Sequence, residues 1–474
     1  MVDVDPTTSV VAASAIVALT TILLLVQRRY HRGASFFSTM MGRIRVVIRS
    51  RAENRELRRL IAVLDEGGGE EGGDDASSSG RTSVSSSRRR RRRPVVSGIF
   101  IHPVKSMRPV SLAETKFDVH GLLHDRRLMI VRPIPRRTIG EYDDGNDHDD
   151  DAPTHRFVTQ RQCPRLATIE VTMPIEIMTD GIRDDATGWK RMGRRSGGMG
   201  RTSKVLIRLS SSSTGSASSS SSSSSSIALA DNDARIYVDV SPSTLIASPL
   251  RYRAGLWGDV VDVVDVGDEA ASFVSNIVRL DDPAYGDVRV VSILPRNLTT
   301  RHVNETYCPH ATRVGYLSTL PQGGLTDGFP ILIATQASLD ELNSRLAKKG
   351  KERLPMSRFR PNIVIDNTSR PFDEDEWKAI RIGTGKDAAI LHIVKGCPRC
   401  KQSCTDQITG ERGNEPLETL SDFRSLGKGG ADVYFATNAI LNGDCYESTI
   451  RVGDPVTILT RGDPVWDADT AQPE

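Results

Sequence analysis

Three stretches of this 474-residue chain are too uniform to form a hydrophobic core, and they limit where folded domains can lie. Arginine fills positions 88–93, aspartate dominates positions 143–151, and serine makes up almost all of positions 210–226. Blocks of like charge and polar low-complexity runs bury too little apolar surface to fold. The last two runs must therefore be surface insertions in a folded body, where longer loops cost little entropy.

An uncharged run near the N-terminus has the length of a membrane span. Residues 9–26 contain no charged side chain, and ~20 apolar residues cross a bilayer. Asp3 and Asp5 precede the run and several arginines follow it, which favours an uncleaved anchor with a cytosolic body over a secretory signal. We expect an anchor over residues 1–27 and a basic, low-complexity linker over residues 28–94. Since no aromatic residues interleave the arginines, nucleic-acid binding is not expected.

Short apolar runs separated by turns follow from residue 95, which predicts a mostly β body of the α+β class. The clearest predicted strands are 96–100, 117–120, 128–132, 157–159, 167–171, 331–334, 363–365, 433–436 and 456–459. One helix is expected from Asp268, whose carboxylate suits a helix start. A second is expected after the capping Thr335, with a stripe of Leu339, Leu342 and Leu346 and an end at Gly350.

Three of the six cysteines, Cys397, Cys400 and Cys404, lie within eight residues. This clustering favours a reducing compartment and a metal or redox role over structural disulfides. The apolar run 388–394 predicts a buried strand, and Gly396 and Pro398 are expected to end it and present the thiols on a loop. A zinc site, an iron–sulfur cluster, a thioredoxin-like dithiol and a pair of inert thiols all remain open. The lack of a fourth nearby ligand argues against the zinc site and the iron–sulfur cluster. The spacing of the cysteines does not decide among the four alternatives.

Motifs on both sides of the cysteines narrow these alternatives. They are HPVKS at 102–106, DRR at 125–127, VTQRQ at 158–162, DGFPIL at 327–332, ASLDELN at 337–343, FRPNIV at 359–364, GCPRC at 396–400, EPLETL at 415–420 and VGDPV at 452–456. In this order they resemble MOSC-domain proteins and, among these, the mitochondrial amidoxime-reducing components. The resemblance implies a MOSC N-terminal β-barrel region over residues 95–255 and a MOSC β-barrel domain with peripheral helices over residues 256–474.

The same resemblance implies a molybdenum cofactor, Mo-molybdopterin, with Cys400 as the protein ligand of the metal. A soft thiolate suits such a metal. The implied cofactor-binding residues are Lys105, Ser106, Arg126, Arg161, Arg360, Asn362, Arg399 and Cys400. Arg399 is expected to favour negative charge on the ligand sulfur. The family resemblance also brings in an association with pyridoxal phosphate.

Cys400 and Asp406 are the implied catalytic residues. Asp406 could relay protons, or it could order its loop by accepting backbone N–H groups. Cys404 stands where the family commonly has threonine, and we expect no particular role for it.

By resemblance, the chain would reduce N-hydroxylated substrates such as amidoximes and hydroxylamines to amidines and amines. The sequence contains no dinucleotide-binding fingerprint, so electrons are expected from NADH through cytochrome b5 reductase and cytochrome b5. The implied location is the outer mitochondrial membrane, with the endoplasmic reticulum as the alternative. The competing function is that of a cofactor-binding or sulfur-carrying MOSC module, against which the anchor and the lack of an aminotransferase-like domain argue.

Overall fold

The computed structural model describes residues 93–135, 152–172, 175–178, 201–209, 235–294, 301–312, 320–430 and 432–467, with a few residues between 52 and 59. The expected anchor, the acidic run, the serine run and nearly all of the expected linker lie outside these residues. No helix in the described part of the chain is long and apolar enough to cross a membrane.

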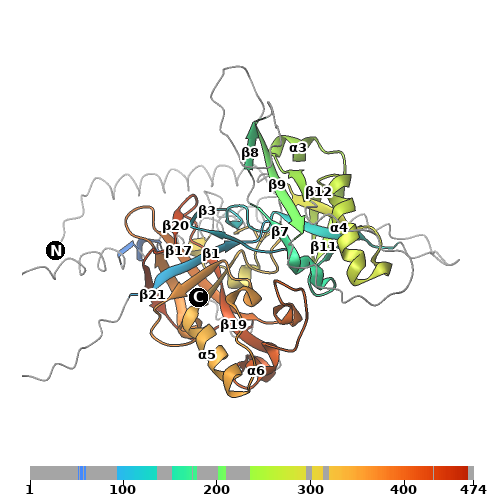
Figure 1. Cartoon of the computed structure of the whole chain (residues 1–474). Helices are drawn as coiled ribbons and strands as arrows, with labels where there is room; N and C mark the ends of the chain where they lie inside the picture. The colour runs from blue at the N-terminus through green and yellow to red at the C-terminus, as the bar shows by residue number, and fades with distance from the viewer. Residues whose placement is uncertain are drawn as a thin grey trace, which may run out of the picture.

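The described residues form a large sheet that combines N-terminal and C-terminal strands (Figure 1). Its order is β2-β1-β15-β14-β19-β17-β16-β21, with β18 paired to β19. The bounds are β1 Val95–Ile101, β2 Val110–Leu112, β14 Ile331–Thr335, β15 Ile363–Asp366, β16 Trp377–Ile382, β17 Ala389–Pro398, β18 Ser425–Leu426, β19 Asp432–Leu441 and β21 Val456–Arg461. A bridge between Val95 and Pro455 joins β1 to the start of β21, so the sheet curls into a nearly closed barrel.

A second unit contains a smaller, closed barrel in the order β11-β12-β13-β5-β6. These strands are β5 Leu128–Pro133, β6 His155–Val158, β11 Arg251–Leu256, β12 Asp259–Asp265 and β13 Arg289–Ile293. A sheet of β7 Ile169–Val171, β8 Ile175–Met178, β9 Arg201–Leu209 and β10 Arg235–Asp239 lies beside it, and β20 Thr449–Arg451 pairs with β3 Glu114–Asp118, which pairs with β4 Gly121–Leu122. Since β5 pairs antiparallel with β6 and β9 with β10, the acidic and serine runs connect hairpin strands.

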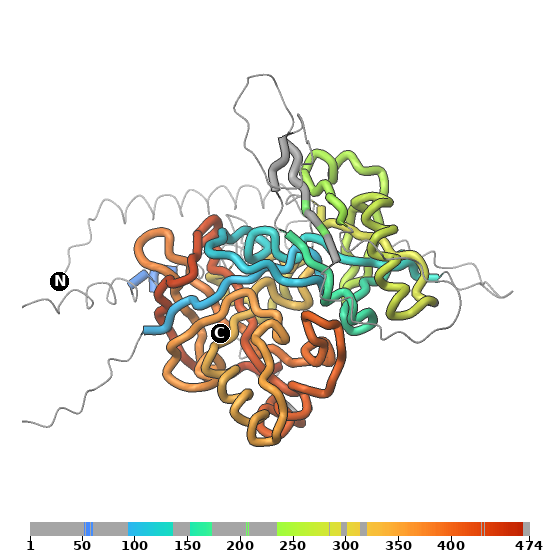
Figure 2. The backbone as a smooth tube through the Cα atoms, viewed as in Figure 1, coloured from blue at the N-terminus to red at the C-terminus, as the bar shows by residue number. Residues whose placement is uncertain are grey.

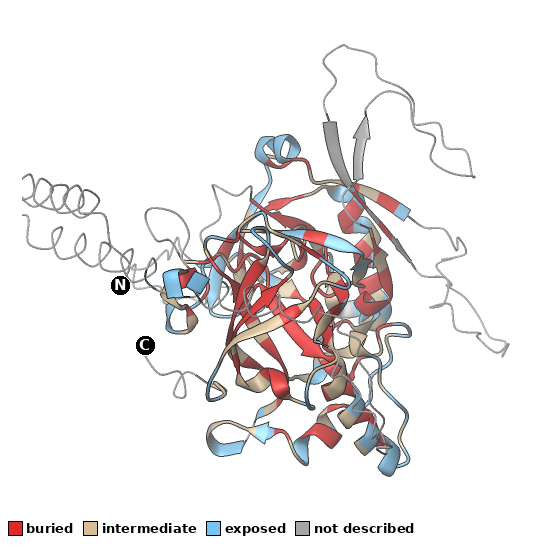
Figure 3. Ribbon diagram, turned by 90° about the vertical axis from the view of Figure 1, so that its left-hand side faces the viewer, coloured by how far each residue is buried: buried red, intermediate tan, exposed pale blue. Residues whose placement is uncertain are grey.

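Helices cover the outside of both units. They are α3 Pro242–Ala247, α4 Asp268–Asp281, α5 Gln336–Lys348 and α6 Leu417–Ser421. The two helices expected from the sequence are confirmed. Thr335 caps α5 by accepting from the Ser338 N–H, and Leu339, Leu342 and Leu346 are buried. Buried residues fill the centre of the strands, while exposed residues lie at the helices and loop tips (Figure 3).

Strand pairing does not follow the expected division at residues 255 and 256. That division falls inside the β11–β12 hairpin, where Leu256 pairs with Asp259. Beyond it, β13 closes the small barrel against β5, whereas β1 and β2 lie in the sheet of C-terminal strands (Figure 2). Periodicity identifies strands but not their partners, so the strand pairing across residue 255 is seen only in the structure.

Candidate functional site

A solvent-open cavity, the junction cavity, lies between loops of the small barrel and the large sheet. It is lined by all eight residues expected to bind a cofactor, which are Lys105, Ser106, Arg126, Arg161, Arg360, Asn362, Arg399 and Cys400. They come from five separate loops, at the ends of β1, β4, β6, η7 (Met356–Phe359) and β17. The structure therefore brings together residues that are almost 300 positions apart in sequence.

The thiols are presented differently from the expected loop. β17 does not stop before Gly396 but continues to Pro398, with register shifts between Ile393 and Lys395 and again before Pro398. β16 pairs with β17 only as far as His392, so the last part of β17 is free of β16. Proline is tolerated there because no ladder hydrogen bond is needed on that side. Cys400 follows as the N-cap of the short helix η9, Lys401–Cys404.

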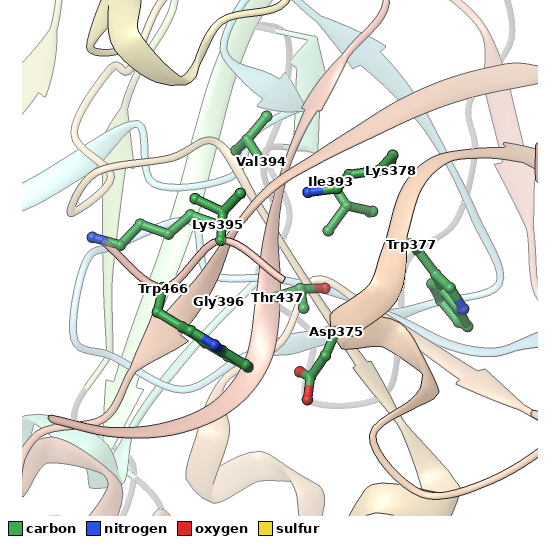
Figure 4. A pocket seen from close by; sticks show the side chains of 10 residues that line it. Asp375, Trp377, Lys378, Ile393, Val394, Lys395, Gly396, Thr437 and Trp466 are labelled. Atoms are coloured by element: carbon green, nitrogen blue, oxygen red, sulfur yellow. The ribbon is translucent and has the colours of Figure 1, made fainter. Parts of the chain in front are cut away.

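Gly396 is required by packing rather than by a turn. A Cβ atom at this position would lie 2.6 Å from ring carbons of Trp466. Figure 4 shows Trp466 lying against this part of β17, where a second cavity is lined by Asp375, Trp377 and Lys378 among others. The aromatic ring thus holds the strand that carries Cys397 toward the junction cavity.

Each thiol has its own guanidinium partner. Arg161 donates from Nε to Cys400 Sγ at 3.2 Å, and Arg399 donates from Nη1 to Cys397 Sγ at 3.0 Å. This differs from the expectation that Arg399 favours negative charge on the sulfur of Cys400. The adjacent Arg399 bends back to Cys397 and to the Phe359 carbonyl, and the distant Arg161 contacts Cys400 instead.

Asp327 is a site residue that the sequence analysis did not single out, although it lies in a matched motif. It accepts hydrogen bonds from Lys105 Nζ and from Trp257 Nε1, and it pairs with Arg161 at 3.5 Å. Partial desolvation by the surrounding protein would by itself raise the pKa of Asp327, but Lys105 and Arg161 hold it below the ordinary value. Burial lowers the pKa of Lys105 to about 8, although Asp327 acts in the opposite direction.

Three cavity residues other than glycine have a left-handed backbone conformation. The φ angles are 71° at Ser106, 47° at Arg126 and 55° at Arg360. Such conformations cost free energy and are found where the surrounding structure must aim a group at a site. Burial lowers the pKa of Arg360 to about 9, with a smaller contribution from Arg126.

Several polar atoms in the cavity are buried without a hydrogen-bond partner in the described structure. They are Ser106 Oγ, Arg161 Nη1, Arg360 Nη2 and Arg399 Nε. Unsatisfied buried donors are rare and costly. Among the described lining residues, five cationic side chains face one carboxylate, that of Asp327. The donor set and the charge balance both suit an anionic ligand.

A buried pair of amides connects the two units behind the cavity, and the sequence analysis missed it. Gln160 and Gln407 exchange hydrogen bonds at 3.0 Å in both directions. Gln160 also donates to the Ser106 carbonyl at 2.7 Å, and Gln407 accepts from Arg360 Nη1 at 2.9 Å. Gln160 belongs to a matched motif, whereas nothing in the local sequence marks Gln407.

Asp406 does not line the junction cavity. Its Oδ1 accepts from the N–H groups of Ile408 and Thr409, and its Oδ2 accepts from Arg358 Nη2 at 3.0 Å. Burial alone would raise the pKa of Asp406, but the two backbone N–H groups lower it below the ordinary value. These contacts describe a residue that orders its loop, and they do not support the expected catalytic role.

Two other residues have mainly structural contacts. Asn362 donates to the Phe100 carbonyl and accepts from the Leu332 N–H, so its amide joins β1 and β14. Cys404 is buried and donates to the Asn414 carbonyl at 3.3 Å, and burial raises the pKa of its thiol. The described residues contain no cluster of three or more His, Cys, Asp or Glu side chains suited to holding a metal ion.

Comparison with known proteins agrees with this architecture. The model of the MOSC N-terminal beta barrel domain matches residues 93–213, and that of the MOSC domain matches residues 322–457. The chain belongs to the MOSC-domain proteins.

Relatives within this class are of two kinds. Mitochondrial amidoxime reducing component 2 of Bos taurus is 32% identical over 46% of this chain and 59% of its own. That of Macaca fascicularis is 27% identical over 76% and 82%. Molybdenum cofactor sulfurase of Aspergillus terreus is 33% identical over 28% of this chain and 16% of its own. The chain thus spans less than two thirds of the bovine and fungal relatives. None of these names mentions pyridoxal phosphate, and that expected association has no support.

Proposed function

We propose that the chain binds a molybdenum cofactor in the junction cavity and reduces N-hydroxylated compounds there. The observation that carries the proposal is the single cavity in which the Cys400 thiol lies among five cations and several unpartnered donors. A pterin cofactor with a phosphate group is anionic and requires such donors, and its metal requires a soft ligand. The residues present therefore fit the group. The names of the relatives support the same reaction.

Each residue has a distinct task in this proposal. Cys400 would supply the thiolate ligand, and Arg161 would orient its sulfur through the Nε hydrogen bond. The anionic part of the cofactor would be held by Ser106, Arg126 and Arg360. Ser106 Oγ and Arg360 Nη2 are donors without a partner in the described structure. When bound, the cofactor supplies two-electron redox chemistry at molybdenum. Asn362 would position the loops rather than contact the ligand.

The electron donors and the location are part of the proposal. We expect electrons from NADH through cytochrome b5 reductase and cytochrome b5. Membrane anchoring would favour this chain of transfers, because confinement raises effective concentration. The mitochondrial names of the relatives support a mitochondrial location.

Metal and pterin analysis of the full-length protein tests the cofactor. Cys400→Ala should lose most of the molybdenum, whereas Cys404→Ala, which removes a buried thiol outside the cavity lining, should retain it. Equal molybdenum in both variants would refute the ligand assignment.

Turnover tests the reaction. The molybdenum-loaded protein should reduce benzamidoxime with NADH, cytochrome b5 reductase and cytochrome b5. The second candidate, a cofactor-binding or sulfur-carrying module, is favoured by the similarity to molybdenum cofactor sulfurases. A fully loaded protein that turns over no N-hydroxylated compound would support this candidate instead.

A further inference from the structure

Trp257 is an exposed aromatic residue beside the junction cavity. It lies between β11 and β12 and is 53% exposed. Its indole Nε1 donates to Asp327 Oδ1 at 3.2 Å, and the guanidinium of Arg161 lies 4.7 Å from the centre of its ring. Because both partners line the cavity, the indole ring stands at the cavity mouth.

The backbone at Trp257 is strained as well. The two-residue connection between Leu256 and Asp259 has a φ of 58° at Trp257, whereas its neighbour Gly258 does not have a positive φ. Turns of this length favour glycine or asparagine where φ is positive, and a bulky residue there is an outlier. Exposure and strain both oppose folding stability, whereas a tilted ring contact with Phe157, whose ring centre lies 5.3 Å away, and the contact with Arg161 support the indole. Strain retained at a cavity mouth is typical of functional positions.

The surroundings indicate what the indole would contact. Arg161 links the indole to the thiol, because its guanidinium also donates to Cys400 Sγ at 3.2 Å. Asp327, whose side chain is 48% exposed, adds a carboxylate that can accept N–H groups. A substrate could thus place a planar ring on the indole, an N–H donor at Asp327 and its reactive group toward Cys400, because these three positions are neighbours.

We infer that Trp257 is a stacking platform that selects substrates with an aromatic or heteroaromatic ring. This inference rests on the proposed function and adds a preference to it. Stacked aromatic pairs contribute about 0.5–1.5 kcal/mol beyond area burial, which corresponds to about 2- to 12-fold in affinity. N-hydroxylated amidines attached to a ring should therefore bind more tightly than aliphatic ones.

The sharpest test is Trp257→Gly, because glycine removes the ring and also relieves the positive φ. For benzamidoxime, KM should rise about 2- to 12-fold with little change in kcat. For acetamidoxime, KM should stay within twofold. Val260→Ala is the matched control, since Val260 is an exposed apolar residue of the same hairpin. It should change neither substrate's KM.

A second variant and a binding measurement separate the outcomes. Trp257→Phe, which keeps a ring but loses the N–H donor to Asp327, should retain most of the preference. Equal loss of kcat for both substrates in Trp257→Gly would overturn the inference, because the indole would then act only by positioning Arg161. If the wild type reduces neither compound, the proposed function fails. Calorimetric titration with the same two amidoximes then tests whether Trp257 is a stacking platform. Equal affinities of the wild type for both compounds would overturn the inference.

Discussion

At the scale of single residues, the charge environment of the thiols depends on contacts that cross the molecule. Arg161 follows β6 of the small barrel, yet it contacts Cys400 at the end of β17. Arg399, one position before Cys400, contacts Cys397. A guanidinium held by both Asp327 and a sulfur atom is fixed in orientation, and these two acceptors raise the pKa of Arg161 although burial alone would lower it. Proximity in sequence was thus a poor guide to the partner of the thiol.

Replacing Arg161 by methionine keeps an unbranched chain but removes the donor to Cys400. Hydrogen bonds that involve charged groups contribute roughly 1.5–3 kcal/mol, so we expect kcat/KM for benzamidoxime to fall about 10- to 100-fold. The control is Arg156→Met, since Arg156 is exposed on β6. Steady-state kinetics normalised to molybdenum content make the measurement, and an unchanged value would contradict the role of Arg161.

Two variants of Asp406 distinguish a role in ordering its loop from a role in relaying protons. Asp406→Asn keeps the Oδ1 acceptor for the Ile408 and Thr409 N–H groups, so we expect an unchanged pH profile of turnover. Asp406→Ala leaves these N–H groups without their acceptor, and the free energy of unfolding should fall by about 1–3 kcal/mol. Denaturant titration and a pH–rate profile measure the two effects. A changed pH profile in the asparagine variant would support the role of Asp406 as a proton relay.

At the scale of elements, β17 and α5 show how the end of a strand and the start of a helix are held in place. β17 carries the first thiol beyond the point where β16 stops pairing, and Trp466 packs on Gly396 there. At the start of α5, the hydroxyls of Thr335 and Ser338 donate to the buried Glu374 at 2.9 and 2.7 Å. Both ends are held by side chains that are distant in sequence.

Gly396→Ala should destabilise the end of β17. The added Cβ would lie 2.6 Å from Trp466 ring carbons, and overpacking of this kind costs about 1–3 kcal/mol. Gly413→Ala is the control, because a Cβ there would meet nothing within 4 Å. Equal unfolding free energies of the two variants would show that Trp466 moves without cost.

Glu374 predicts a pH dependence of stability. Burial raises the pKa of Glu374 from 4.5 to about 7, so the folded state binds the proton more tightly than the unfolded state. The stabilisation is complete below pH 4.5 and is lost as pH rises through 7. The melting temperature of the wild type relative to Glu374→Gln should therefore be highest at pH 5 and fall by pH 8. A difference that is constant across this window would contradict the shift.

At the scale of the whole molecule, the junction cavity exists only because the two units meet. The small barrel contributes Arg126 and Arg161 through loops beside β5 and β6, and the large sheet contributes Arg360 and Cys400. The Gln160–Gln407 amide pair lies behind the cavity and links a barrel loop to the loop that follows η9. Ser106 and Arg360, which are proposed to hold the cofactor, are therefore connected by one buried network.

A double-mutant cycle on this pair tests the coupling. Gln160→Leu or Gln407→Leu alone leaves a buried amide unpaired and should cost about 1–3 kcal/mol of unfolding free energy. The double variant should cost less than the sum, because no amide is then left without its partner. Strictly additive costs would show that the two amides do not depend on each other.

The sequence by itself determined part of the local structure, and the family resemblance named eight residues of the candidate site. Short apolar runs located about half of the described strands, the cap and leucine stripe located α5, and the matched motifs named eight residues that all line one cavity. The strands and the helix depend on neighbours in the chain, which a sequence shows directly, whereas the eight residues are implied by the resemblance to a family. Only the tertiary structure decided the strand partners across residue 255, the pairing of Arg161 with Cys400, the place of Asp406 outside the cavity and the strained Trp257 at its mouth. Such features depend on which distant segments pack together, and local propensity carries no information about that.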